Sequence, residues 1–342
     1  MQLDDVCELI VDCEHKTAPT QETGYPSIRT PNIGPGFFIL DGVNRVSEET
    51  YQFWTRRAVP QPGDLIMARE APVGNVAMIP QGLRPCLGQR TLLIRPNRIK
   101  VEPSFLNYFL NGPYVQGLIH AKTNGATVAH LNMKDVRTMD LPSLPPIAEQ
   151  RRVAGILSTY DEWIANSQRR IRILEEMARA LYREWFVHFR FPGHDKTARI
   201  ASPLGDIPKG WEVKRLNDIA ENMRRNVLKG ELHEPKYYVG LEHIPRRSLA
   251  LDAWETASDI GSNKLEFKKG EVLFGKIRPY FHKVSVAPFD GLCSADTIVV
   301  RARYPEHYAF VVACVSSDAF VAEAERVNDF ATPGCMNLVS NG

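Results

Sequence analysis

The sequence predicts an α+β fold in which two similar modules are separated by a long coiled-coil-type helix. Two observations predict this arrangement: short motifs of the first half recur in the second half, and a heptad pattern of apolar residues occupies the middle of the chain. Within a module, short apolar runs between glycine and proline signals indicate strands, and a helical stretch follows them. We therefore expect each module to contain a small, curved, largely antiparallel sheet.

The internal repeat consists of four pairs of short motifs. The two members of each pair lie about 206 residues apart, which is too regular for chance. The pairs are 62–66 with 269–273, Cys86 with Cys293, 91–95 with 297–301, and 126–127 with 331–332. Strands are expected at 64–67, 92–94, 272–274 and 297–300, and helical stretches at 104–110 and 308–324.

The segment between the modules carries a heptad seam. From residue 153 onward, apolar or aromatic residues recur at alternating steps of four and three, with Ser167 as the exception. Two prolines at 145–146 suit the start of a helix and Pro192 with Gly193 its end, so an unbroken helix over 147–189 would be roughly 64 Å long. We expect the seam to pack against a partner helix through Val153, Leu157, Tyr160, Ile164, Ile171, Leu174, Leu181 and Trp185.

The composition limits the classes of protein that fit. With 44% hydrophobic and 24% charged residues, the chain of 342 residues is ordinary globular protein. A net charge of +2 excludes a polybasic coat, so DNA binding would need basic residues gathered on particular faces. The longest apolar run, 308–315, is too short to span a bilayer. Six scattered cysteines without a CxxC pair indicate neither a zinc site nor a disulfide framework, and favour a reduced, cytoplasmic protein.

Motifs of stand-alone enzymes are missing from the sequence. The stretch Asn111 to Tyr114 has glycine where the base-holding loop of an amino-methyltransferase has its first proline, and no glycine-rich cofactor turn is evident. The acidic residue Glu70 lacks the lysine that a nuclease would place two residues later. We therefore expect no catalytic residues, no metal site and no cofactor. A DNA methyltransferase or nuclease acting alone is a disfavoured alternative, and a coiled-coil adaptor that binds only proteins stays open.

Three stretches resemble the central conserved region of specificity subunits of type I restriction-modification systems. They are LPPIAEQRRVA at 144–154, LEEMARALYREWF at 174–186 and FRFPG at 189–193. The resemblance implies a first target-recognition domain at 1–144, a spacer helix at 145–192, a linker at 193–210 and a second target-recognition domain at 211–342. It further implies that the second domain is incomplete and that a second spacer helix, which packs on the first in this family, is missing.

The same resemblance implies a function and a set of partners. A protein of this family is non-catalytic, recognises a bipartite target in double-stranded DNA, and directs adenine methylation or cleavage by other subunits. Modification (M) subunits would bind S-adenosylmethionine, and motor-nuclease (R) subunits would use ATP and Mg²⁺. Self-association through the unpaired spacer helix is expected if the second helix is lacking.

Candidate DNA-reading residues lie in loops between the expected strands. The loop at 276–283 combines basic and aromatic residues with a proline, and 69–75 is its counterpart in the first half. An arginine fork suits guanine and an asparagine amide suits adenine, whereas solvated loop charges are the alternative interpretation. The candidates are Arg69, Asn75, Lys122, Thr123, Asn124, Lys276, Arg278, Tyr280, His282 and Lys283.

Overall fold

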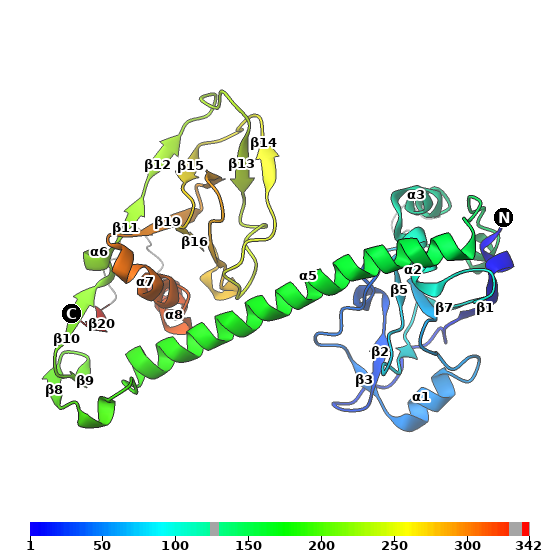
Figure 1. Cartoon of the computed structure of the whole chain (residues 1–342), viewed down its shortest axis with the longest axis horizontal. Coiled ribbons are helices and arrows are strands. Elements are labelled where there is room, and N and C mark those ends of the chain that lie inside the picture. The colour runs from blue at the N-terminus through cyan, green and yellow to red at the C-terminus, as the bar shows by residue number, and fades with distance from the viewer. Residues whose placement is uncertain (124–129, 328–336, 342) are drawn as a thin grey trace. The chain divides into compact units, whose positions relative to one another are not determined.

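The computed structural model describes residues 1–123, 130–327 and 337–341, and it divides into two compact units, Met1–Ile164 and Ala165–Gly342. Both units combine helices with strands, and the long helix α5 (Ile147–Tyr182) lies between the two strand-rich parts along the chain (Figure 1). The predicted α+β class with a long intervening helix is confirmed. None of the helices in the described part has the length and hydropathy needed to cross a membrane.

The first unit is built on a four-stranded antiparallel sheet of order β1-β7-β4-β5. A smaller sheet of order β3-β2-β6 lies beyond it in the same unit. The elements before α5 are η1 (Leu3–Val6), β1 (Cys7–Asp12), β2 (Tyr25–Ile28), η2 (Thr30–Asn32), β3 (Arg45–Val46), α1 (Glu48–Trp54), β4 (Leu65–Ala68), β5 (Val76–Met78), β6 (Cys86–Leu87), β7 (Thr91–Pro96), α2 (Pro103–Asn111), α3 (Pro113–Ala121) and α4 (Met133–Arg137).

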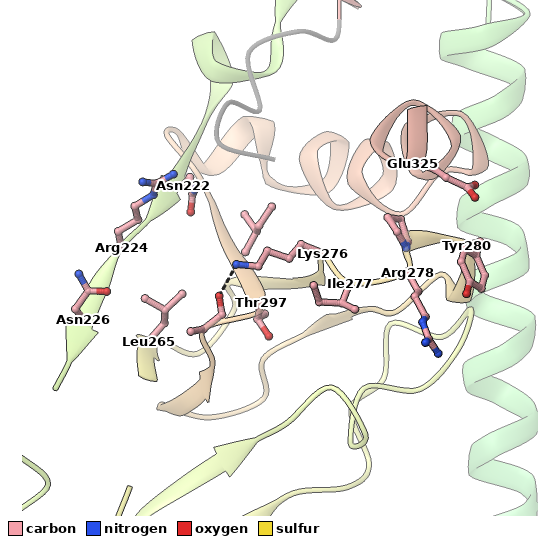
Figure 2. A pocket seen from close by; sticks show the side chains of 13 residues that line it. Asn222, Arg224, Asn226, Leu265, Lys276, Ile277, Arg278, Tyr280, Thr297 and Glu325 are labelled. Atoms are coloured by element: carbon pink, nitrogen blue, oxygen red, sulfur yellow. Dashed lines mark hydrogen bonds between the residues drawn. The ribbon is translucent and has the colours of Figure 1, made fainter. Parts of the chain in front are cut away.

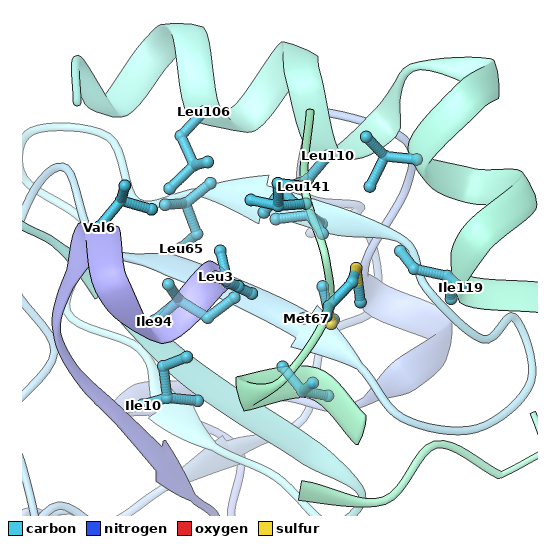
Figure 3. Packing of buried hydrophobic residues seen from close by; sticks show 14 of the residues in the cluster. Leu3, Val6, Ile10, Leu65, Met67, Ile94, Leu106, Leu110, Ile119 and Leu141 are labelled. Atoms are coloured by element: carbon cyan, nitrogen blue, oxygen red, sulfur yellow. The ribbon is translucent and has the colours of Figure 1, made fainter. Parts of the chain in front are cut away.

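Strand β4 is apolar throughout because both faces of its sheet are covered. Successive side chains of a strand point to opposite faces. Leu65 and Met67 join a core with residues of α2 and α3 such as Leu106 (Figure 3), whereas Ile66 packs in a second core on the other face. All four residues of β4 are buried. A short continuous apolar run between turn signals is what a strand buried on both faces requires.

The second unit repeats this construction, with a four-stranded antiparallel sheet of order β11-β19-β16-β17. A five-stranded sheet of order β12-β15-β18-β13-β14 belongs to the same unit. The elements after α5 are η3 (Arg183–Val187), η4 (His194–Lys196), β8 (Arg199–Ser202), β9 (Gly205–Pro208), β10 (Trp211–Arg215), α6 (Leu216–Ile219), β11 (Ala220–Met223), β12 (Arg225–Val227), β13 (Lys236–Val239), β14 (Glu255–Ala257), β15 (Lys264–Phe267), β16 (Val272–Gly275), η5 (Pro279–Phe281), β17 (Val284–Val286), β18 (Gly291–Ser294), β19 (Thr297–Ala302), η6 (Pro305–His307), α7 (Tyr308–Val315), α8 (Asp318–Val327) and β20 (Asn337–Asn341).

Strand register shows that the two units are copies of one module. Leu65 pairs with Ile94 in the first unit, and Val272 pairs with Val300 at the corresponding place in the second. Each unit also contains one parallel pair of strands, β2 with β6 and β13 with β18. The sequence repeat over 62–66 and 91–95 therefore corresponds to a structural repeat; the pair 126–127 with 331–332 lies outside the described residues.

The helices differ from the prediction at two places. Helix α5 gives way to a π-helical turn, η3, which ends at Val187 rather than at the expected Phe189. Phe189 has a left-handed backbone (φ +57°), and Arg190 N–H donates to Glu184 O at 2.7 Å, which closes the helix end. The single helix expected over 308–324 is two helices, because Ser317 caps a new helix start by accepting from Phe320 N–H at 3.2 Å.

Candidate nucleic-acid interface

The hairpin loop between β16 and β17, residues 276–283, is anchored to the body of the second unit. His282 is buried, and its Nε2 lies 2.8 Å from the carbonyl oxygen of Ser316. Lys283 donates through Nζ to the carbonyl oxygen of Leu241. These two candidate residues hold the loop in place from inside the fold, so they are not presented to a nucleic acid in this structure.

Arg278 and Tyr280 lie on the outer side of the same loop. Arg278 is exposed, and among the described residues its guanidinium has no hydrogen bond or ion pair. Tyr280 is 55% exposed. Arg278 adopts a left-handed backbone (φ +51°) that is uncommon outside glycine, and strained positions of this kind often occur at functional sites.

Arg278 and Tyr280 border an open cleft of about 760 Å³ (Figure 2). The opposite wall comes from Asn222 in β11, Asn226 in β12 and Arg224 between these two strands. The remaining polar residues at the cleft are Lys276, Thr297 and Glu325. The cleft is thus lined by three basic side chains and one acidic side chain, together with amide and hydroxyl groups, a combination that can hold phosphate oxygens and base edges.

Lys276 forms the floor of this cleft. Its Nζ donates to the carbonyl oxygen of Ala295 at 2.8 Å, drawn as a dashed line in Figure 2, and lies 3.6 Å from a carboxylate oxygen of Asp296. The ammonium group is thus held in one position and half-buried. The nearby Asp296 carboxylate offsets part of this positive charge.

In the first unit, the counterpart loop at 69–75 is arranged differently. Arg69 is 5% exposed, and its Nη1 donates to Asp12 Oδ2 at 2.7 Å, while its Nε donates to the carbonyl oxygen of Leu131 at 2.9 Å. Asn75 donates through Nδ2 to the carbonyl oxygen of Ile33 at 2.9 Å. Both candidate side chains are engaged within the fold, which counts against either of them as a reader of base edges.

The third group of candidates follows α3. Lys122 and Thr123 are half-buried, and Thr123 donates through Oγ1 to the carbonyl oxygen of His120 at 2.7 Å. Asn124 lies outside the described residues. Lys122 and Thr123 belong to the first unit, whereas every residue that lines the cleft of Figure 2 belongs to the second.

The heptad seam of α5 is uncovered in the described structure. Seven of its eight residues are exposed, from 37% for Ile171 to 61% for Leu174, and Trp185 is half-buried. Helix α5 instead packs on the core of the first unit through another stripe that contains Gln150 and Ala154. The packing that was predicted for the seam residues therefore stays a prediction about a partner helix.

Comparison with known proteins identifies the family. A family model described as the type I restriction modification DNA specificity domain matches residues 1–176. The chain belongs to this family.

Two curated relatives agree with this assignment, and a solved structure shares the fold. The chain is 28% identical over 182 residues to the type I restriction enzyme MjaIX specificity subunit of Methanocaldococcus jannaschii, which covers 53% of this chain and 41% of that relative. It is 28% identical over 244 residues to the type I restriction enzyme EcoDI specificity subunit of Escherichia coli, which covers 65% and 53%. The chain spans about half the length of the curated relatives it matches. The crystal structure of the type-I restriction-modification system S subunit from M. genitalium has the same fold, with a TM-score of 0.60 at 14% identity over 99% of this chain and 83% of that chain.

Two features of this specificity-domain protein were missed by sequence reasoning. The first is the cleft wall formed by Asn222, Arg224 and Asn226; their alternate spacing places them on one face of an extended segment and was the available signal. The second is Glu175, whose Oε1 accepts hydrogen bonds from Ser248 Oγ at 2.9 Å and Leu249 N–H at 2.8 Å. Nothing in the helical sequence around Glu175 distinguishes it from its exposed neighbours.

A metal ion has one candidate position in the described part of this specificity-domain protein, where ligand atoms of Asp12, Cys13 and His15 lie within 4.8 Å of one another. Asp12 is already paired with the guanidinium of Arg69 at 2.7 Å, which repels a cation. Burial raises the pKa of the Cys13 thiol, so the thiolate that would bind a metal is disfavoured. Two of the three candidate ligands are therefore poorly suited to bind a metal ion.

Proposed function

We propose that this chain reads DNA sequence for a type I restriction-modification complex and supplies no catalytic residues of its own. The observation that carries the proposal is the repeated four-stranded sheet, with matching strand order and register, before and after a long helix. Two copies of one module suit a target of two half-sites, each read by one unit. The family match over residues 1–176 supports a role in DNA specificity.

In this proposal each unit presents loops to the major groove, where base edges carry distinguishable donor and acceptor patterns. Basic side chains and backbone N–H groups near those loops hold phosphates and set the register of the protein on the duplex. Helix α5, with 36 residues and a length of about 54 Å, is the stiff element that keeps the unread gap between the half-sites constant.

The proposed partners are double-stranded DNA, M subunits and R subunits. Adenine methylation and DNA cleavage would be carried out by these subunits, so S-adenosylmethionine, ATP and Mg²⁺ would be bound there and not by this chain. The exposed seam of α5 is the surface proposed for self-association, because a coiled-coil seam requires a second helix.

Methylation mapping tests the proposed function directly. The chain is expressed with an M subunit of a type I system in a host that lacks adenine methyltransferases, and methylated adenines in the host DNA are located by long-read sequencing. The expected result is methylation within one split motif that disappears when this chain is omitted. Methylation that is independent of the chain, or a contiguous motif without a gap, would contradict the proposal and favour a protein-binding adaptor.

A further inference from the structure

Strand register allows the two hairpin loops to be compared position by position. In both sheets a threonine of the neighbouring strand pairs with the last residue of the hairpin strand, which is Ala68 in β4 and Gly275 in β16. The next residue, Arg69 in the first unit and Lys276 in the second, therefore occupies the same place in its module. Two residues further, Ala71 and Arg278 also correspond.

The residue that faces Arg69 in the first unit differs in charge from the equivalent residue near Lys276 in the second unit. Ile10 in β1 and Asn222 in β11 pair with equivalent residues of the neighbouring strand. Asp12 and Arg224, each two residues further along, are therefore equivalent. This position is acidic in the first unit and basic in the second.

Because of this difference, Arg69 is buried in an ion pair in the first unit, whereas the basic residues of the second unit line an open cleft. In the first unit Asp12 pairs with Arg69 at 2.7 Å, and their side chains are only 17% and 6% exposed. In the second unit Arg224 has the same charge as Lys276, so that ion pair is impossible. Both side chains line the cleft instead, together with the exposed guanidinium of Arg278.

We propose that the second unit reads a guanine through Arg278 in this cleft, whereas the hairpin loop of the first unit makes no base contact. The inference rests on the proposed function. An arginine fork donates two parallel hydrogen bonds to O6 and N7 of guanine, which is the commonest specific contact in the major groove. The net positive charge of the cleft draws the sugar-phosphate backbone toward the same place.

Hydrogen bonds hold the loop at 276–283 in one conformation before DNA binds. Phe281 N–H donates to the carbonyl oxygen of Arg278 at 3.0 Å, and His282 N–H donates to the carbonyl oxygen of Pro279 at 2.7 Å. The buried ring of His282 fixes the far end of this turn. A reader held on a fixed turn loses little conformational freedom on binding and discriminates between bases more sharply.

The test uses the same methylation mapping, with the full chain, an M subunit and a plasmid library that carries randomised sequence. Arg278→Gln should relax the motif at one G·C pair in one half-site, where discrimination falls by about tenfold, and leave the other half-site strict. Arg278→Lys should relax the same pair because lysine keeps the charge but lacks the fork. Arg303→Gln removes an exposed arginine of the second unit outside the cleft and should leave the motif intact, as should Ala71→Ser in the first unit.

Several outcomes would overturn the inference. One is an unchanged motif in Arg278→Gln, and another is relaxation at an A·T pair. A third is a uniform loss of methylation at all sequences, which would indicate that Arg278 contacts a phosphate. A changed motif in Ala71→Ser would show that the first hairpin loop contacts bases after all. Thermal unfolding by circular dichroism shows whether Arg278→Gln folds, and Arg278→Lys decides if it does not. Absence of any split motif with the unchanged chain is a separate result that removes the proposed function itself.

Discussion

The ion pair between Asp12 and Arg69 shows how one neighbouring carboxylate determines whether an arginine side chain is available to bind a ligand. The guanidinium of Arg69 is buried, and three groups surround it: the Asp12 carboxylate, the carbonyl oxygen of Leu131, and His130, whose Nε2 lies 3.1 Å from Arg69 Nη2. A buried ion pair adds little net stability over an apolar pair of similar volume. Removal of one partner alone is costly because it leaves an uncompensated charge in the interior.

Asp12→Ala should therefore destabilise the first unit by about 3 kcal/mol. Hydrogen exchange measured by mass spectrometry on peptides from β4 and β7 reports the free energy of opening of this unit separately from the second. Asp41→Ala is the matched control, because Asp41 is exposed and its side chain makes no hydrogen bond or ion pair within the described part of the chain. Equal exchange in the two variants would show that the Asp12–Arg69 pair does not hold the loop.

Arg69 and Arg278 also show which part of the candidate site was predictable from the sequence. Both arginines lie in a loop between two apolar runs, and local sequence assigns them the same role. The difference arises from Asp12, which is distant along the chain and reaches Arg69 through the pairing of β1 with β7 and of β7 with β4. Local chemistry therefore selected both loops as candidates, but it could not tell an exposed guanidinium from a neutralised one.

At the scale of the elements, Glu175 joins α5 to the segment 248–250 of the second unit. Its Oε1 accepts from the backbone N–H of Leu249 at 2.8 Å and of Ala250 at 3.2 Å, and also from the hydroxyl of Ser248. Its Oε2 lies 3.0 Å from Nη2 of Arg179. Hydrogen bonds to a charged acceptor are stronger than neutral ones, so this one side chain fixes the segment on the helix.

Glu175→Ala should release the segment 248–250 from the helix. We expect the amide protons of Leu249 and Ala250 to exchange at least tenfold faster, which corresponds to a loss of about 1.4 kcal/mol or more. Glu176→Ala removes an exposed neighbour of the same charge and should leave both rates unchanged. Glu175→Gln keeps one carbonyl acceptor and should fall between the two. If Glu175→Ala and Glu176→Ala behave alike, the segment is held by the surrounding packing alone.

The elements themselves were largely predictable, because their patterns are local. The seam of α5 follows from a spacing of 3.5 residues, and β4, β7, β16 and β19 follow from short apolar runs between turn signals. The break between α7 and α8 was missed because apolar residues continue past it. What ends α7 is a pair of serines whose side chains compete for backbone groups, with Ser316 Oγ donating to the carbonyl oxygen of Val312 at 2.8 Å.

On the scale of the whole molecule, α5 carries an apolar stripe that neither unit covers. Leu157 is 38% exposed, Tyr160 57% and Leu174 61%. Scattered apolar residues are common on protein surfaces, but a continuous row at heptad spacing is the surface of a helix that pairs with another helix. Since no helix in the described part of the chain lies on this row, a second copy of the chain is the occupant that we expect in the absence of other subunits.

The purified chain should therefore sediment as a dimer at micromolar concentration. Leu174→Glu places a charge in the seam, where pairing would bury it unpaired, and should shift the chain to a monomer. Ile173→Glu is the matched control: Ile173 is 48% exposed and adjacent on the same helix, but it lies outside the heptad positions, so this variant should stay dimeric. Circular dichroism establishes that the helix persists in both variants. If the unsubstituted chain sediments as a monomer with α5 intact, the stripe does not mediate self-association and binds a different partner.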